Sequence, residues 1–238
     1  MAWFKNAFFF FLLCGWGVGC QNANEPSNDT TSSTLTPAAV SADSTQQSAQ
    51  PEKTILFFGN SLTAGYGLDP SDAYPALIQK KLDSLGYDYR VINAGLSGET
   101  TASGVTRLDW VLDRQPVDIF VLELGGNDGL RGIDLRETRR NLEAIVDSVK
   151  QANARTEIVL AGMMIPPNMG EAYADRFQKI FPEVAQQENI HLIPFLLQGV
   201  GGEPELNQPD GIHPTAQGQK IVANNVWEVL EPLLQKSS

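Results

Sequence analysis

Short apolar runs recur along the chain, and longer segments of mixed character separate them. Three of these runs are continuous and rich in β-branched residues, a pattern typical of strands that are buried on both faces of a parallel sheet. The runs that we expect to form strands are Thr54–Phe58, Tyr89–Asn93, Val117–Leu122, Glu157–Ala161 and His191–Phe195.

The segments between these runs carry apolar residues at helical spacing. They predict helices over Ser71–Leu85, Thr101–Asp113, Leu135–Ala152, Ala172–Gln187 and Thr215–Gln235. Ser71 or Asp72 is placed to cap the first helix, and Pro182 is expected to kink or split the fourth. Strands that alternate with helices predict an α/β fold, in which a parallel sheet has helices on both faces. In such folds the site lies at the carboxyl ends of the strands.

The amino-terminal segment has a different pattern. A single lysine precedes the apolar run Ala7–Leu13, which is shorter than the ~20 apolar residues that span a bilayer. This arrangement predicts a secretory signal with a cleavage site. The small residues before Cys20 resemble the signal of bacterial lipoproteins, in which the cysteine is acylated and the signal is cut before it. We therefore expect a signal over 1–19 and a lipidated Cys20 that anchors the protein to a membrane of the bacterial cell envelope, on the periplasmic or surface side. The alternative is an ordinary signal with an incidental Cys20.

Composition adds a tether and a single domain. Residues 20–51 are rich in Ser, Thr, Asn, Gln and Pro and lack periodic apolar spacing, so we expect a disordered linker. Residues 52–238 are long enough for one domain with a sizeable core. The net charge of −11 disfavours nucleic acid as a partner. The two cysteines, Cys14 and Cys20, both precede this domain, which therefore has no disulfide and no cysteine metal site.

Four loops outside the predicted strands are rich in Gly, Asn, Ser and Asp. They read GNSLTAGYG, NAGLSGET, LGGNDGLRG and QPDGIHPTAQG. The topology allows them to converge on one rim of the sheet. Ser61 in the first loop is then a candidate nucleophile. His213 in the last loop is suited to take its proton, and Asp210 is suited to orient the imidazole.

The same loops offer donors for the oxyanion that forms in acyl transfer. These donors are the backbone N–H groups of Ser61 and Gly95 and the side-chain amide of Asn127. Each residue taken alone is typical of a turn, so the prediction depends on their conjunction. His191, at the start of a strand, is interpreted as structural. No G-x-S-x-G or G-x-x-x-x-G-K-[ST] motif is present, and two histidines without a domain cysteine disfavour a zinc site.

The four loops, in this order, resemble the four blocks of the SGNH (GDSL-type) hydrolase family. Within that family the chain looks most similar to the bacterial periplasmic thioesterase I, lysophospholipase and arylesterase group. The resemblance implies a flavodoxin-like three-layer α/β/α sandwich with a five-stranded sheet of order 2-1-3-4-5, the SGNH hydrolase fold. It also implies that no cofactor or metal is needed. The residues that it implies are Ser61, Asp210 and His213 as the catalytic triad, and Ser61, Gly95 and Asn127 as the oxyanion hole.

One position departs from the family pattern. The family usually has Gly-Asp-Ser, whereas this chain has Gly59-Asn60-Ser61. The family aspartate is not part of the triad, and asparagine keeps a carbonyl acceptor of similar size. We therefore expect Asn60 to have a modest effect on the rate.

Two segments resemble the substrate-lining loops of the family. They are the loop after Asn127 and the segment Met163–Tyr173, whose Met, Ile and Pro residues suit an apolar acyl pocket. We expect Leu130, Ile165 and Pro166 to contact the substrate. The expected function is that of a monomeric serine esterase acting on a small acyl ester, a lysophospholipid or an acyl-thioester. The alternatives are a carbohydrate O-acetyl esterase and a non-catalytic flavodoxin-like binding module.

Overall fold

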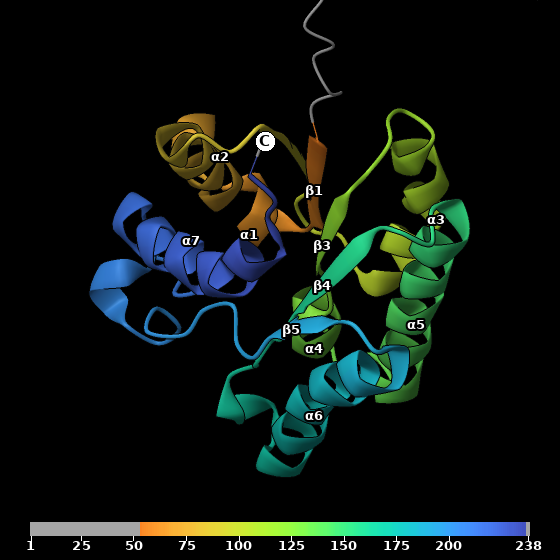
Figure 1. Cartoon of the computed structure of the whole chain (residues 1–238). Helices are drawn as coiled ribbons and strands as arrows, with labels where there is room; N and C mark the ends of the chain where they lie inside the picture. The colour runs from red at the N-terminus through yellow and green to blue at the C-terminus, as the bar shows by residue number, and fades with distance from the viewer. Residues whose placement is uncertain (1–52, 237–238) are drawn as a thin grey trace, which may run out of the picture. The chain divides into compact units, whose positions relative to one another are not determined.

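A five-stranded parallel sheet forms the centre of the domain, which a computed structural model describes over residues 53–236 (Figure 1). Its strands are β1 Lys53–Gly59, β2 Tyr89–Gly95, β3 Ile119–Glu123, β4 Glu157–Ala161 and β5 His191–Ile193. Their order across the sheet is β2-β1-β3-β4-β5, and every neighbouring pair is parallel. All five predicted strands are present. The last is shorter than predicted because Pro194 has no N–H to continue the ladder.

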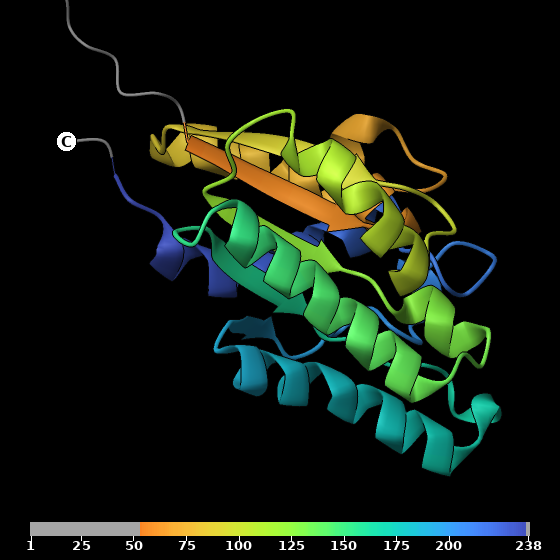
Figure 2. The same cartoon turned by 90° about the vertical axis from the view of Figure 1, so that its right-hand side faces the viewer.

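Helices cover both faces of this sheet. The α-helices are α1 Ser61–Ala64, α2 Tyr74–Leu85, α3 Thr101–Leu112, α4 Gly126–Leu130, α5 Leu135–Ala152, α6 Glu171–Glu188 and α7 Ala216–Leu230. Short 3-10 turns occur at Pro70–Asp72, Pro167–Met169, Pro204–Leu206 and Glu231–Leu233. Helices α2 and α7 pack together on one face, and α3, α5 and α6 lie in a row on the other (Figures 1 and 2). This is the predicted three-layer α/β/α sandwich.

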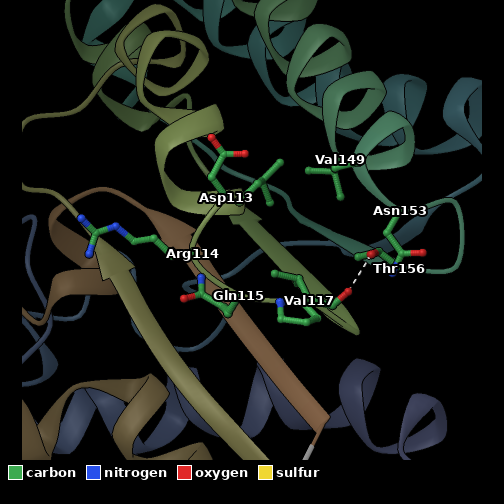
Figure 3. A pocket seen from close by; sticks show the side chains of 10 residues that line it. Asp113, Arg114, Gln115, Val117, Val149, Asn153 and Thr156 are labelled. Carbon is green, nitrogen blue, oxygen red and sulfur yellow. Dashed lines mark hydrogen bonds between the residues drawn. The ribbon is translucent and has the colours of Figure 1, made fainter.

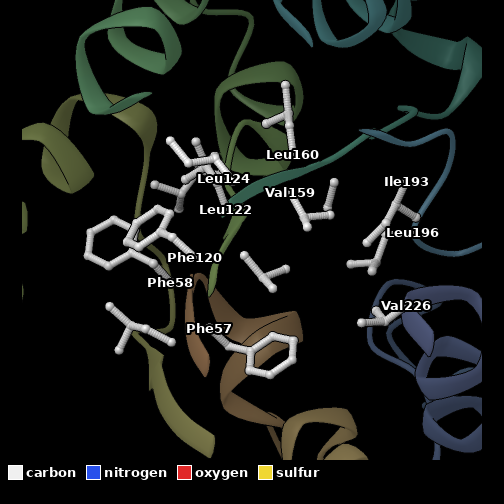
Figure 4. Packing of buried hydrophobic residues seen from close by; sticks show 14 of the residues in the cluster. Phe57, Phe58, Phe120, Leu122, Leu124, Val159, Leu160, Ile193, Leu196 and Val226 are labelled. Atoms are coloured by element: carbon white, nitrogen blue, oxygen red, sulfur yellow. The ribbon is translucent and has the colours of Figure 1, made fainter. Parts of the chain in front are cut away.

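The central strands are buried because their side chains enter the core on both faces. In β1, Phe57 and Phe58 are fully buried and point to opposite sides of the sheet (Figure 4). Phe57 meets the ring of Tyr74 from α2 edge-on, with 5.4 Å between the ring centroids. Phe58 packs against Phe120 of β3, with 5.6 Å between the centroids. A strand that serves two core layers requires a continuous apolar run, which is why these strands were visible in the sequence.

The start of α2 differs from the prediction. The helix begins at Tyr74 and not at Ser71, because the preceding residues Pro70–Asp72 form a separate 3-10 turn. Ala73 occupies the cap position without a side-chain hydrogen bond, so neither Ser71 nor Asp72 caps the helix. Pro75 in its first turn lacks the N–H that would otherwise need an acceptor there.

Prolines also decide the two differences in the carboxyl-terminal helices. Helix α6 is a single helix across Pro182, so the predicted split does not occur. Pro182 is exposed, and the buried side chains of Phe181 and Val184 hold the inner face of the helix against the core. Helix α7 ends at Leu230, earlier than predicted, because Pro232 lies two residues later, within the 3-10 turn Glu231–Leu233.

The register aligns the carboxyl ends of β1, β2 and β3 at the same end of the sheet. Gly59 at the end of β1 pairs with Gly95 of β2 and with Glu123 of β3. The loops that follow these strands therefore start from one edge, as expected for an α/β site.

A hollow of about 360 Å³ lies at the opposite edge, where β3 and β4 begin, and contains none of the predicted site residues. Figure 3 shows its lining side chains, which include Asp113, Arg114, Gln115, Val117, Asn153 and Thr156.

Within residues 53–236, no helix is long and apolar enough to cross a membrane. In the same range, no three His, Cys, Asp or Glu side chains are grouped to hold a metal ion. The predicted signal over 1–19, the linker over 20–51 and Cys20 lie outside the described residues. The domain boundary at residue 52 stays a prediction.

Candidate active site

Ser61, His213 and Asp210 form a hydrogen-bonded chain at the carboxyl edge of the sheet. Ser61 is the first residue of α1, whereas Asp210 and His213 lie in the turn before α7. The Oγ of Ser61 lies 2.8 Å from Nε2 of His213. Nδ1 of the same ring lies 2.7 Å from Oδ2 of Asp210. The structure thus brings together three predicted residues, although Ser61 and His213 are 152 positions apart.

A compact turn holds the Asp210 carboxylate against the imidazole. Its Oδ1 accepts hydrogen bonds from the backbone N–H groups of Ile212 at 2.9 Å and His213 at 3.0 Å. Gly211 has a φ of +69°, a left-handed conformation that glycine adopts without steric cost. The backbone N–H of His213 and the imidazole hydrogen bond are the main causes that lower the pKa of Asp210 to about 2. The ionised carboxylate favours a proton on Nδ1 and leaves Nε2 as the acceptor for the Ser61 hydroxyl.

Tyr66 belongs to the site, although the sequence analysis did not identify it. Its side chain is half exposed, and its ring lies 4.6 Å from the His213 ring, centroid to centroid. Nε2 of Gln208 donates to the backbone oxygen of Tyr66 at 2.7 Å, and the Gln208 N–H donates to the backbone oxygen of His213 at 2.7 Å. Gln208 thus ties the loop after α1 to the His213 turn. In the sequence Tyr66 is an aromatic residue between two glycines, a pattern that does not locate it in space.

Asn127, on the short helix α4, lines the same cavity as Ser61. Its Nδ2 donates to the backbone oxygen of Glu99 at 2.9 Å, and this nitrogen carries a second hydrogen. The neighbouring Asp128 is buried and accepts a hydrogen bond from the N–H of Thr101 at 2.9 Å. These bonds tie α4 to the start of α3. They fix the Asn127 amide and leave one of its N–H groups available to a ligand.

Gly95, predicted as a backbone donor, does not line the cavity. Its N–H donates to Oδ1 of Asn93 at 3.0 Å. A Cβ at this position would lie 2.3 Å from the backbone nitrogen of Ala64, so the packing of α1 against β2 requires glycine there. The structure therefore gives Gly95 a packing role, because its N–H already has an acceptor within the protein.

Gly98, three residues further on, does line the cavity. It has a φ of +82°, and its carbonyl accepts a hydrogen bond from the guanidinium of Arg131 at 3.0 Å. Its N–H donates to no acceptor in the part of the chain that the structure describes. The sequence NAGLSGET contains both glycines and does not say which one faces the cavity. The end of β2 decides it, since Gly95 is still in the strand and Gly98 lies beyond it.

A cavity of about 520 Å³ opens beside Ser61 and His213. Leu130, Ile165 and Pro166, the predicted substrate contacts, all line it. Its further apolar lining consists of Leu62, Met163, Met164, Phe195, Leu197 and Ile212. A largely apolar wall with polar groups gathered around one serine suits an apolar chain whose reactive carbonyl lies at that serine.

Asn60, where the family usually has aspartate, caps α1. Its side chain is buried, and its Oδ1 accepts a hydrogen bond from the N–H of Leu62 at 2.9 Å. The same oxygen lies 3.4 Å from the Ser61 Oγ, farther than the 2.8 Å to His213. Asn60 therefore supplies the expected carbonyl acceptor to the backbone of the helix, and His213 is the nearer partner of the serine hydroxyl.

His191, which the sequence indicates to be structural, does not join this group. His191 begins β5, and its Nε2 lies 3.1 Å from Oε2 of Glu157, a surface contact that leaves the ring outside the cavity. Cys20 belongs to the part of the chain that the structure does not describe. Its lipidation stays a prediction.

Comparisons with known proteins agree with this geometry. Residues 57–221 match the GDSL-like Lipase/Acylhydrolase family. The chain is 43% identical to Esterase TesA of Pseudomonas aeruginosa over 190 residues, which are 80% of this chain and 92% of that protein. It is 38% identical to Thioesterase 1/protease 1/lysophospholipase L1 of Escherichia coli K12 over 185 residues, which are 78% of this chain and 86% of that protein. The crystal structure of TesA covers 76% of this chain and 100% of its own, with a TM-score of 0.74 at 42% identity.

Proposed function

Because the chain belongs to the GDSL-like lipase/acylhydrolase family, also called SGNH hydrolases, and is a carboxylic ester hydrolase, we propose that Ser61, His213 and Asp210 carry its catalysis. One observation carries the assignment. The hydrogen bonds of 2.8 Å and 2.7 Å run unbroken from the serine through the imidazole to the carboxylate, beside a largely apolar cavity. This is the arrangement that serine acyl transfer requires.

In the first half-reaction the Oγ of Ser61 attacks the carbonyl carbon, and Nε2 of His213 takes the hydroxyl proton. The carbonyl double bond opens to an oxyanion, and the Asp210 carboxylate stabilises the imidazolium that has formed. When the C–O or C–S bond breaks, His213 returns its proton to the leaving alcohol or thiol. The acyl group remains on Ser61 as an ester.

The oxyanion is stabilised by donors whose hydrogens have no acceptor within residues 53–236. We assign these donors as the N–H of Ser61, the N–H of Gly98 and the second Nδ2 hydrogen of Asn127. Gly98 thus replaces Gly95 in the set expected from the sequence. The Ser61 N–H is the first N–H of α1, where the helix dipole also favours negative charge.

In the second half-reaction a water molecule attacks the acyl-enzyme. His213 takes a proton from this water, the oxyanion forms again at the same donors, and the C–O bond to Ser61 breaks. The proton passes from His213 to the Ser61 Oγ, and the free acid leaves. Each proton taken by His213 is returned within its half-reaction, so the cycle needs no cofactor.

We assign single-chain acyl compounds as substrates: small acyl esters, lysophospholipids and acyl-thioesters. The support is the apolar lining at Leu130, Ile165 and Pro166, which offers few partners for the hydroxyl groups of a sugar. The relatives carry names with the same scope, Esterase TesA and Thioesterase 1/protease 1/lysophospholipase L1. A profile over acyl length and leaving group tests this scope. Higher kcat/KM on acetylated sugars than on acyl esters would instead indicate a carbohydrate esterase.

The catalytic assignment is tested by Ser61→Ala. This variant should lose roughly a thousandfold or more in the hydrolysis of p-nitrophenyl butyrate while its thermal unfolding stays close to that of the wild type. The removed Oγ is the only atom that forms the acyl bond, and Ala is compatible with the helix. Wild-type activity in this variant would refute the mechanism.

For the amino-terminal part we propose a lipid anchor at Cys20 that holds a monomeric enzyme at a membrane of the cell envelope. The support for the anchor is the sequence pattern before Cys20. Cys20→Ala should move the protein from the membrane fraction to the soluble fraction, because two or three acyl chains on one cysteine supply firm anchoring. Unchanged fractionation would refute the proposed anchor. Light scattering of the released protein tests whether it is a monomer.

A further inference from the structure

A buried carboxyl group lies directly beneath the nucleophile and has no part in the mechanism above. Glu123 is the last residue of β3, and its exposed fraction is 0%. The register pairs it with Gly59, two residues before Ser61. A carboxyl group in the interior loses its hydration, so its polar partners must compensate for that loss.

All of these partners are donors from the residues on either side of Ser61. Oε2 of Glu123 accepts from the N–H of Asn60 at 3.0 Å, the N–H of Thr63 at 3.3 Å and the Oγ1 of Thr63 at 2.8 Å. Oε1 accepts from Nδ2 of Asn60 at 2.7 Å. One carboxyl group thus grips the chain on both sides of the nucleophile.

These contacts decide which N–H of α1 is left for the substrate. The first N–H groups of a helix have no acceptor within the helix. In α1 the N–H of Leu62 is bound by Asn60 Oδ1, and the N–H of Thr63 is bound by Glu123. The Ser61 N–H is the one in this first turn with no acceptor among the residues that the structure describes. The carboxyl group therefore satisfies the deeper donors and leaves the proposed oxyanion donor free.

The fit around this group is tight. A Cβ on Gly59 would lie 2.6 Å from Oε2 of Glu123 and 2.2 Å from Oγ1 of Thr63. Only glycine allows β1 to pass this close to the carboxyl group. A displacement of Glu123 would therefore be transmitted directly to Asn60 and Thr63, and through them to Ser61.

We propose that Glu123 is a positioning residue whose buried carboxylate, bound to Asn60 and Thr63, fixes Ser61 and its N–H for acyl transfer. This inference rests on the proposed function of Ser61. Its distinctive element is the pairing of the carboxylate with the Asn60 amide, which occurs at the position where the family usually has Gly-Asp-Ser. With aspartate there, two carboxyl groups would meet, whereas in this chain an amide donates to a carboxylate.

The protonation state of Glu123 sets the pH range in which it can take this role. Burial raises the pKa of Glu123 to about 7, against the opposing effect of its hydrogen bonds from Thr63 and Asn60. Tyr74 is the titratable group that faces it, through the 2.7 Å contact between the Tyr74 hydroxyl and Thr63 Oγ1. The carboxylate matches four donors, whereas protonation places a hydrogen against one of them. The positioned state is therefore the ionised one.

Glu123→Gln is the direct test, because it keeps the shape and changes one acceptor into a donor. The new amide nitrogen would face Nδ2 of Asn60, donor against donor. In full-length protein at pH 8, we expect kcat for p-nitrophenyl butyrate to fall roughly tenfold or more, with KM changed less than about twofold, because Ser61 moves while the cavity stays. Amide hydrogen exchange should quicken at Asn60 and Thr63 but not in the middle of β1.

The sharper test is rescue by the double variant Asn60→Asp/Glu123→Gln. It exchanges the amide and the carboxylate, so the amide at 123 donates to the carboxylate at 60. The other oxygen at 60 still caps Leu62, and the carbonyl at 123 still accepts from Thr63. We expect kcat to return to within about threefold of the wild type, since every donor again meets an acceptor. Loss of function through damaged folding alone would not be repaired by this second change.

Glu157→Gln is the matched control. Glu157 is exposed and lies at the amino-terminal end of β4, away from the site, so this substitution should leave kcat unchanged. A Glu123→Gln protein with wild-type kcat and unchanged exchange at Asn60 and Thr63 would overturn the inference. A folded double variant that is as slow as Glu123→Gln would overturn it as well. The exchange measurement does not depend on hydrolysis. It therefore separates this inference from the catalytic role of Ser61, which Ser61→Ala tests.

Discussion

The two halves of the site are built in different ways. The half that carries Ser61 stands on the ends of buried strands, where the side chains of Asn60, Thr63 and Glu123 are all buried. The half that carries His213 is a surface turn, in which the Asp210 side chain is 38% exposed and the His213 side chain 17%. The serine is placed by the core of the domain, and the base is placed by a few local hydrogen bonds.

This difference determines how much each half can change without loss of stability. A group held by buried donors cannot move without leaving some of them unsatisfied, and each such loss costs about 1–3 kcal/mol. The Asp210 turn depends on backbone hydrogen bonds within four residues, and water can replace them. Changes in the His213 half should therefore impair catalysis and spare folding, whereas changes beneath Ser61 should impair both.

The largest effect is expected on the exposed half, with His213→Ala. Removal of the base leaves the Ser61 hydroxyl without an acceptor for its proton, and kcat/KM should fall by roughly 10⁴-fold. The midpoint of thermal unfolding should stay close to that of the wild type, because His213 lies in a turn outside the hydrophobic core. A His213→Ala protein that unfolds several degrees earlier would show that this turn, too, supports the core.

A glycine pair compares the two halves by stability alone. In Gly59→Ala the new methyl would lie 2.2 Å from Thr63 Oγ1 and 2.8 Å from the backbone oxygen of Glu123, so at least one element must shift. We expect a loss of about 3 kcal/mol or more in the free energy of unfolding. In Gly211→Ala nothing lies within 4 Å of the methyl, and the φ of +69° alone should cost roughly 1 kcal/mol. Urea unfolding measures both, and equal losses would contradict the contrast.

The two halves should also respond to pH with opposite sign. The pKa of Glu123 is raised from 4.5 to about 7, so the folded state binds more protons between these values and the free energy of unfolding falls as pH rises through them. The loss is roughly 3 kcal/mol and levels off above the folded pKa. The pKa of Asp210 is lowered from 3.8 to about 2, so its stabilisation is present above 3.8 and is lost as pH falls toward 2.

Urea unfolding at pH 4.5 and pH 8 measures the first of these effects, with Glu123→Gln as the reference without the titrating group. Between pH 4.5 and pH 8, the free energy of unfolding of the wild type should fall relative to that of Glu123→Gln. Asp210→Asn supplies the second reference, near pH 3. If the stability difference between the wild type and Glu123→Gln is the same at pH 4.5 and pH 8, protonation of Glu123 is not coupled to folding.

The sequence predicted the elements that have a period long enough to be seen. Helix α5 has four buried apolar residues at helical spacing, and its predicted bounds Leu135–Ala152 are those of the structure. The short helices α1 and α4 have no visible period, because one helical turn shows no repeat. Distant contacts hold both helices: the Glu123 carboxylate accepts from the N–H of Thr63 in α1, and the side chains of Asn127 and Asp128 tie α4 to residues 99 and 101. No neighbouring residue in the sequence carries that information.

The candidate site divides in the same way. The residue types of Ser61, Asp210 and His213 indicate their chemistry, and the parallel topology predicts that their loops meet at one rim of the sheet. The sequence predicts Gly95 as the backbone donor, whereas Gly98 lines the cavity. The difference depends on where β2 ends, a boundary that residue patterns locate poorly. Glu123 was missed because a glutamate after an apolar run is typical of a strand leaving the core. Its burial depends on Asn60 and Thr63, which belong to the cap and the body of helix α1 after β1.

The smallest effect sharpens the comparison at the seam between the halves, where Tyr66 from the serine side lies 4.6 Å from the His213 ring. An aromatic face stabilises an adjacent cation by about 0.5–1 kcal/mol at an exposed site, and the imidazole becomes cationic as Ser61 attacks. Tyr66→Ala should therefore lower kcat by about threefold, with little change in the free energy of unfolding because the side chain is 52% exposed. Tyr66→Phe keeps the ring and is the matched control, with kcat close to that of the wild type. If phenylalanine is as harmful as alanine, the hydroxyl and not the ring face supports His213, and the seam would be a hydrogen-bonded contact like those beneath Ser61.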